Sequence, residues 1–216
     1  MNKKLIVLIG AIIIIAIVGI LIFVFVGNNN ENDNETNNNM NHENINSANN
    51  NDNSDNTEES NILVLYFSMS GNTEAVANII HNEVGGNIIK LETKEEYPKD
   101  YDELLDYAQE EQRDHARPEL ATTIDNIDNY DIIFLGYPIW WTDMPMPIYT
   151  FLDEYDLSGK TIAPFITHGG SGLSGTPATI REEEPNATVT EGLAIYGSRA
   201  QNSRDQIIDW LNNIEM

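Results

Sequence analysis

Short apolar runs alternate five times with amphipathic segments between residues 61 and 216. Each run has the length of a strand, and the segment after it has the spacing of a helix. This alternation predicts a parallel sheet covered by helices on both faces, because two parallel strands need a crossover connection. We expect strands at residues 62–67, 87–91, 131–136, 160–167 and 188–195. We expect helices at residues 73–83, 100–113, 148–154, 176–183 and 203–212.

A hydroxyl-rich turn joins the first predicted strand to the first predicted helix. It consists of Ser68, Met69, Ser70, Gly71, Asn72 and Thr73. A phosphate at a helix N-terminus meets backbone N–H groups without intrahelical partners and the positive end of the helix dipole. The hydroxyls and the Asn72 amide add donors, and Gly71 permits close approach of the backbone. The turn lacks the lysine of a Walker loop and the G-x-G-x-x-G fingerprint. It is a candidate cradle for a terminal monophosphate, and the alternative is an ordinary N-cap by Ser70 or Thr73.

A second loop holds two of the three tryptophans of the chain. The predicted strand 131–136 runs directly into Tyr137, Pro138, Ile139, Trp140 and Trp141. Ligands of open parallel sheets bind outside the carboxyl ends of the strands, where this loop and the hydroxyl-rich turn both lie. Adjacent tryptophans point in different directions, so we expect one to face the ligand as a stacking platform. The alternative is that both pack in the core.

These segments resemble the flavodoxin-like family of FMN proteins, in the subgroup that carries a Pro-x-Trp-Trp loop. Residues 68–73 match the family's phosphate signature, and residues 144–147, 158–165 and 167–172 continue the likeness over residues 61–216. The resemblance implies an α/β fold with a doubly wound five-stranded parallel sheet of order 2-1-3-4-5, and FMN as the cofactor. It implies these cofactor-binding residues: Ser68, Met69, Ser70, Gly71, Asn72, Thr73, Pro138, Ile139, Trp140, Trp141, His168, Gly169, Gly170 and Gly172.

The loop after the fourth predicted strand departs from small electron-carrier flavodoxins, which place an acidic and aromatic wall there. Residues 167–175 are glycine-rich instead, which leaves space beside the flavin and favours an enzyme with a second substrate. His168 can donate to a flavin carbonyl or protonate an acceptor, or it can satisfy local backbone groups. Asp143 either lowers the flavin potential or serves as a turn residue. No histidine or carboxylate has the spacing of a metal site.

The residues before this domain predict a membrane anchor and a tether. Residues 5–26 form a run of 22 residues without a charged side chain, long enough to cross a bilayer core of about 30 Å. Lys3 and Lys4 predict a cytoplasmic N-terminus and a domain outside the membrane, while a cleaved signal peptide is the alternative. Residues 28–60 contain 16 Asn and eight acidic residues without Lys or Arg, which is typical of a disordered linker. We therefore divide the chain into residues 1–27, 28–60 and 61–216.

Charge and composition limit the functions that remain. Residues 61–216 hold 27 Asp and Glu against nine Lys and Arg, which argues against a nucleic-acid partner. The absence of cysteine excludes disulfides, thiol catalysis and iron–sulfur clusters. We predict a membrane-tethered, FMN-dependent electron-transfer oxidoreductase. Its donor and acceptor are proteins or small molecules such as a quinone or a nicotinamide. One-electron shuttling and two-electron reduction both stay open, as does a flavin-free surface binding domain.

Overall fold

The computed structural model describes residues 61–214. Its strands are β1 (Ile62–Tyr66), β2 (Asn87–Lys90), β3 (Ile132–Pro138), β4 (Thr161–His168), β5 (Thr188–Val189) and β6 (Leu193–Tyr196). Its α-helices are α2 (Asn72–Val84), α3 (Tyr101–Arg113), α4 (Met146–Glu154), α5 (Thr176–Glu183) and α6 (Arg204–Leu211). Two 3₁₀ helices are η1 (Ile127–Asn129) and η2 (Gly197–Asn202). The predicted anchor and linker lie outside the described residues. Within 61–214, no helix has the length and apolarity needed to span a membrane.

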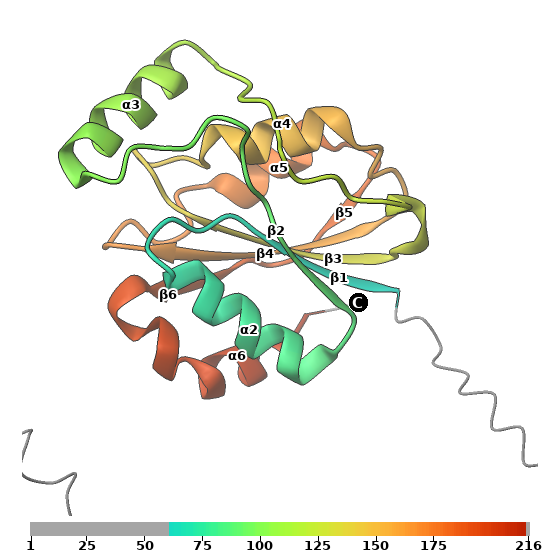
Figure 1. Cartoon of the computed structure of the whole chain (residues 1–216). Coiled ribbons are helices and arrows are strands. Elements are labelled where there is room, and N and C mark those ends of the chain that lie inside the picture. The colour runs from blue at the N-terminus through green and yellow to red at the C-terminus, as the bar shows by residue number, and fades with distance from the viewer. Residues whose placement is uncertain (1–60, 215–216) are drawn as a thin grey trace, which may run out of the picture. The chain divides into compact units, whose positions relative to one another are not determined.

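The strands form one parallel sheet in the order β2-β1-β3-β4-β5, with β6 also paired to β4. This order confirms the predicted 2-1-3-4-5 arrangement. In Figure 1, α2 and α6 lie on one face of the sheet, and α3, α4 and α5 lie on the other side. The doubly wound α/β fold predicted from the alternation is therefore confirmed.

The prediction of one continuous strand over residues 188–195 is wrong. Two short strands stand there, and both pair with β4: β5 with its first residues and β6 with its last four. The chain leaves the ladder at Glu191 and Gly192. A Cβ on Gly192 would lie 2.9 Å from the Leu173 side chain and 3.0 Å from that of Pro177, so this close approach needs a glycine. The carbonyl of Glu191 is satisfied by Trp210 of α6, whose Nε1 donates to it at 2.8 Å.

Alternate residues of the central strands feed two hydrophobic layers, as the period of two requires. Leu63, Leu65, Ile133 and Leu135 belong to the layer under α4 and α5. The other layer, under α2 and α6, includes Val64, Phe134 and Phe165. Gly136 allows this second layer to close, because a Cβ there would lie 2.1 Å from the Phe165 ring. The core is thus closely packed where Gly136 of β3 meets Phe165 of β4.

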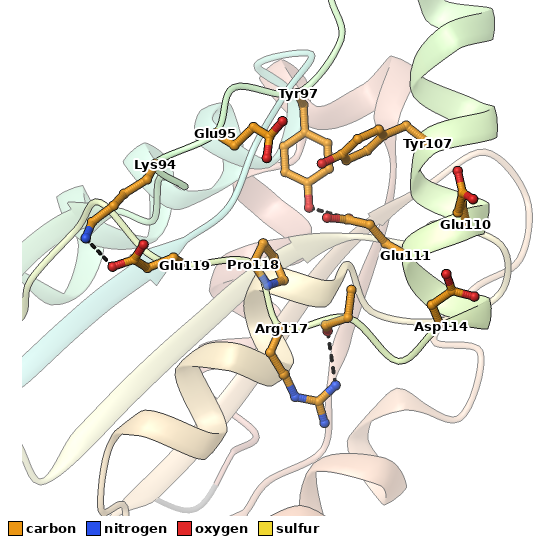
Figure 2. A pocket seen from close by; sticks show the side chains of 11 residues that line it. Lys94, Glu95, Tyr97, Tyr107, Glu110, Glu111, Asp114, Arg117, Pro118 and Glu119 are labelled. Atoms are coloured by element: carbon orange, nitrogen blue, oxygen red, sulfur yellow. Dashed lines mark hydrogen bonds and ion pairs between the residues drawn. The ribbon is translucent and has the colours of Figure 1, made fainter.

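Helix α3 is held differently from the other helices. Long connections, residues 91–100 and 114–131, join it to the strands, and only Ala108 and Glu111 of its 13 residues are buried. Figure 2 shows its main polar attachment: the Tyr97 hydroxyl donates to Glu111 at 2.6 Å. Burial raises the pKa of Tyr97 and also that of Glu111. Helix α3 therefore stands at the edge of the core, with much of its surface free to line a site.

Candidate functional site

The turn after β1 leaves polar groups without partners at the start of α2. Gly71 precedes the helix with φ of 81°, and no side chain caps the helix N-terminus. The alternative of an N-cap by Ser70 or Thr73 is therefore not what the structure has. Ser68 Oγ is buried and makes no hydrogen bond within residues 61–214. A phosphate would satisfy both the unpaired helix N–H groups and this hydroxyl, so the turn fits such a group.

Thr73 acts in this turn through a contact that its sequence position does not indicate. Its Oγ1 shares a buried hydrogen bond of 2.8 Å with Oγ1 of Thr167, at the end of β4. The hydroxyl therefore fixes the start of α2 against β4 and does not face open space. Only the backbone of Thr73 stays in the first turn of α2, where a phosphate is expected.

The tryptophan loop is a tight two-residue turn. Trp140 N donates to the Asp143 carbonyl at 3.0 Å, and Asp143 N donates to the Trp140 carbonyl at 2.9 Å. Trp141 and Thr142, between them, have φ of 48° and 65°. Two left-handed central residues are the geometry of a type I′ turn, which glycine and asparagine favour and which strains a β-branched residue. The loop thus stores backbone strain at the site.

Asp143 holds this strained turn in place. Its Oδ1 accepts hydrogen bonds from Met144 N at 2.8 Å and from the Tyr149 hydroxyl at 2.9 Å. The Gln112 amide reaches both its Oδ2 and the Trp141 carbonyl at 3.4 Å. Asp143 therefore serves as a turn residue, which is one of the two roles considered for it.

The two tryptophans have different surroundings. Trp140 is half-buried and packs edge-to-face against Phe67 at 5.4 Å and Tyr97 at 5.5 Å. Trp141 is 43% exposed, and its Nε1 donates to the Leu105 carbonyl of α3 at 3.0 Å. Trp140 is consequently anchored in the aromatic core, while Trp141 bridges the loop to α3 with its ring accessible. This supports Trp141 as the stacking residue.

His168 ends β4 with its protonation set by the backbone. Its Nδ1 accepts hydrogen bonds from the N–H groups of Gly170 at 2.9 Å and Gly172 at 3.2 Å. The proton of the neutral ring therefore sits on Nε2. Burial lowers the pKa of His168, and its ring packs against Tyr196 at 4.4 Å. A neutral Nε2–H can donate to a carbonyl oxygen, whereas a cationic general acid is disfavoured here.

A cavity of about 630 Å³ at the carboxyl edge of the sheet brings several predicted residues together. Those that line it are Ser70, Asn72, Pro138, Ile139, Trp140, Trp141, His168 and Gly169. The remaining predicted residues lie in or next to the same loops but do not line this cavity: Ser68, Met69, Gly71, Thr73, Gly170 and Gly172. The structure thus joins the hydroxyl-rich turn, the tryptophan loop and the glycine-rich loop around one space.

The sequence interpretation missed Thr167 of β4 and two further groups of cavity residues. One group is on α3: Tyr101, Leu104, Leu105 and Ala108. The other is the last residue of β6 and the two residues after it: Tyr196, Gly197 and Ser198. A Cβ on Gly197 would lie 2.8 Å from the Asn72 amide, so the glycine lets this segment meet the phosphate turn. The helical spacing on α3 was a usable signal, while the second group depends on the break between β5 and β6.

The parallel sheet and the loops at its carboxyl edge place the protein among the flavodoxin-like α/β proteins. The chain belongs to the flavodoxin family, whose family model matches residues 61–214.

Solved structures agree with this assignment. A protein of Bacteroides eggerthii DSM 20697, described as a flavoprotein, is 32% identical with a TM-score of 0.64, over 71% of this chain and 96% of that chain. The flavoprotein of Lactobacillus acidophilus NCFM, solved in complex with FMN, is 26% identical with a TM-score of 0.55, over 65% of this chain and 96% of that one.

The alignment with a curated relative is shorter. The flavodoxin-like domain-containing protein BilS of Clostridioides difficile (strain CD3) is 33% identical over 122 residues. That alignment takes in 56% of this chain and 54% of BilS, so this chain spans about half the length of that relative.

Replacing Thr142 with glycine tests the strain in the tryptophan turn. We expect the free energy of unfolding to rise by about 0.5–1 kcal/mol, because glycine adopts positive φ without the penalty of a β-branched residue. Urea denaturation measures the change. Thr123→Gly is the matched control, since Thr123 is exposed and its φ is not positive. Thr123→Gly should lower the free energy of unfolding. A lower free energy of unfolding in both variants would contradict backbone strain at Thr142.

Replacing His168 with glutamine tests the neutral imidazole. The lowered native pKa means that the unfolded chain binds the proton first as the pH falls, so stability declines below the ordinary histidine pKa of about 6.5. The decline continues until the native pKa is reached. Urea denaturation of the FMN-free protein between about pH 7.5 and pH 5 should show a flatter pH dependence for His168→Gln than for the wild type. The same dependence of unfolding free energy on pH in both proteins would refute the neutral imidazole at His168.

Proposed function

We propose that this protein is a membrane-tethered, FMN-dependent oxidoreductase. FMN is the cofactor, as the flavodoxin family assignment and the FMN complex of the Lactobacillus acidophilus relative support. The observation that carries the proposal is the cavity, in which Ser70 and Asn72 of the phosphate turn lie beside an accessible tryptophan. FMN supplies the redox chemistry when bound, and the protein positions it and controls access.

Each part of the cavity has a task in this proposal. The turn from Ser68 to Thr73 holds the phosphate through backbone N–H groups and hydroxyls, without a positive side chain. Trp141 offers an aromatic surface to the flavin ring, and the strained turn fixes its position. His168 offers its Nε2–H to a flavin carbonyl oxygen, because its Nδ1 is already engaged by two backbone donors.

The open space of the cavity favours an enzyme over a carrier. Helix α3 extends the cavity beyond the loops that the flavodoxin resemblance assigned to the cofactor. The glycine-rich loop after β4 also leaves room for a second substrate. The one-electron shuttle is the second candidate, since the excess of 27 acidic over nine basic residues suits docking to a basic redox protein.

The location proposed for this activity is the cell membrane, with a single pass and a cytoplasmic N-terminus. The support is the uncharged run of residues 5–26 behind Lys3 and Lys4. The flavodoxin-like domain then faces away from the cytoplasm, on a tether formed by residues 28–60. Its donor and acceptor are redox proteins or small molecules such as quinones.

The phosphate turn is tested by Ser70→Glu, because Ser70 is exposed and lines the cavity. A carboxylate there repels the FMN phosphate, so the dissociation constant for FMN should rise at least tenfold, on the order of 1.4 kcal/mol. Affinity for riboflavin, which lacks the phosphate, should change little. Ser158→Glu is the control, since it adds the same charge at an exposed turn before β4. Equal losses for FMN and riboflavin would refute a phosphate site at this turn.

An anaerobic reductive titration of the FMN-loaded protein tests the redox role. We expect the visible absorbance to bleach in one phase without a long-wavelength semiquinone band, as two-electron chemistry requires. A semiquinone band that rises and decays would favour the one-electron shuttle instead. A spectrum identical to that of free FMN, with no bound flavin, would remove the oxidoreductase proposal.

A further inference from the structure

Helix α3 presents an apolar stripe that lines the cavity. The stripe consists of Tyr101, Leu104, Leu105 and Ala108, at the i, i+3, i+4, i+7 spacing of one helix face. Tyr101 is 70% exposed, and both leucines are only half-buried. An amphipathic helix usually buries such a stripe against its own core. Here Ala108 is buried and Leu104 packs partly against the core, while Tyr101 and Leu105 are left available to a ligand.

Trp141 joins this stripe to the cofactor side of the cavity. Its Nε1 donates to the Leu105 carbonyl, and the Gln112 amide of α3 reaches the Trp141 carbonyl. The α3 wall, defined as Tyr101, Leu104, Leu105 and Ala108, is apolar, and Trp141 links it to the tryptophan loop. The remaining lining is more polar, because it includes Ser70, Asn72 and Ser198 from the turns after β1 and β6. A ligand on the α3 wall would meet aliphatic and aromatic carbon next to the position of the flavin.

The charges around the α3 wall select against anions. No Asp, Glu, Lys or Arg lines this cavity among residues 61–214. The rest of α3 carries exposed acidic side chains, namely Asp102, Glu103, Asp106 and Glu110. A phosphate, carboxylate or sulfonate on the wall would find no lysine or arginine to pair with, in an acidic field. A neutral or cationic ring system meets no such repulsion there.

We propose that the α3 wall binds a planar aromatic acceptor that is neutral or cationic, and that it discriminates against anionic acceptors and against nicotinamide dinucleotides. This inference rests on the proposed function and names its substrate class. For a quinone-type acceptor, the α3 wall would hold the ring beside the cofactor, and reduced FMN would supply the two electrons and two protons that convert the quinone to the hydroquinone.

A matched pair of probes tests this discrimination by equilibrium binding, without turnover. The full chain in nanodiscs is loaded with FMN in the oxidised form, and empty nanodiscs serve as the reference for partitioning. Isothermal titration calorimetry then compares 1,4-naphthoquinone with 1,4-naphthoquinone-2-sulfonate. We expect the neutral probe to bind at least tenfold more tightly. Raising the salt from about 0.02 M to about 0.3 M should strengthen binding of the sulfonate and leave the neutral probe unchanged, because salt screens repulsion.

A pair of variants tests whether the neutral probe binds at helix α3. Leu105→Gln keeps a good helix former but makes the wall polar, so the neutral probe should bind about tenfold more weakly. Ala121→Gln is the control, since Ala121 is exposed and does not line the cavity. Stopped-flow reoxidation of the photoreduced protein should follow the same order of probes and variants.

The outcomes separate the two proposals. Failure of the chain to retain FMN during loading would overturn the proposed function. Retained FMN with equal affinities for both probes, or with no effect of Leu105→Gln, would overturn this inference alone. Retained FMN with no binding of either probe would also overturn it, in favour of a protein partner at α3.

Discussion

All strands of the sheet run in the same direction, and the site depends on this constraint. Parallel strands end at one edge, so the loops after β1, β3, β4 and β6 meet although they are distant in sequence. A buried contact secures the meeting point, since the hydroxyls of Thr73 and Thr167 bond across the start of α2 and the end of β4. The glycines at 136 and 197 let neighbouring segments close against each other. The cavity therefore lies where these loops converge at the carboxyl edge of the sheet.

Within this frame, unfavourable local features are concentrated where a ligand is expected. Ser68 Oγ is buried without a partner in the described part of the chain, and Trp141 and Thr142 occupy the left-handed region. Each feature costs stability, and each is surrounded by contacts that hold it in place, such as the hydrogen bonds to Asp143. His168 follows the same pattern, because its environment opposes the charged form of its ring. Unpaired groups and strain at one edge of an otherwise well-packed sheet are typical of a functional site.

The sequence allowed much of this arrangement to be predicted, for reasons that are local. Apolar runs and helix-start signals are properties of neighbouring residues, so the main strands, the helices and the two ligand loops followed from them. The strand order followed from the resemblance to flavodoxins. The break between β5 and β6 was missed because Gly192 is constrained by Leu173 and Pro177, which are packed against it only in the fold. The Thr73 hydroxyl was assigned to the phosphate because its partner is 94 residues away.

Helix α3 is a second case in which the sequence pattern did not predict the tertiary contacts. Its periodicity established an apolar face, but periodicity does not reveal whether a core or a cavity covers that face. The long connections on either side of α3, residues 91–100 and 114–131, are what free it from the sheet. This separation has an evolutionary consequence. Residues of α3 and its connections can be exchanged or lengthened without altering a strand or the phosphate turn, so proteins that share this cofactor site can diverge in what they reduce by changing one peripheral helix.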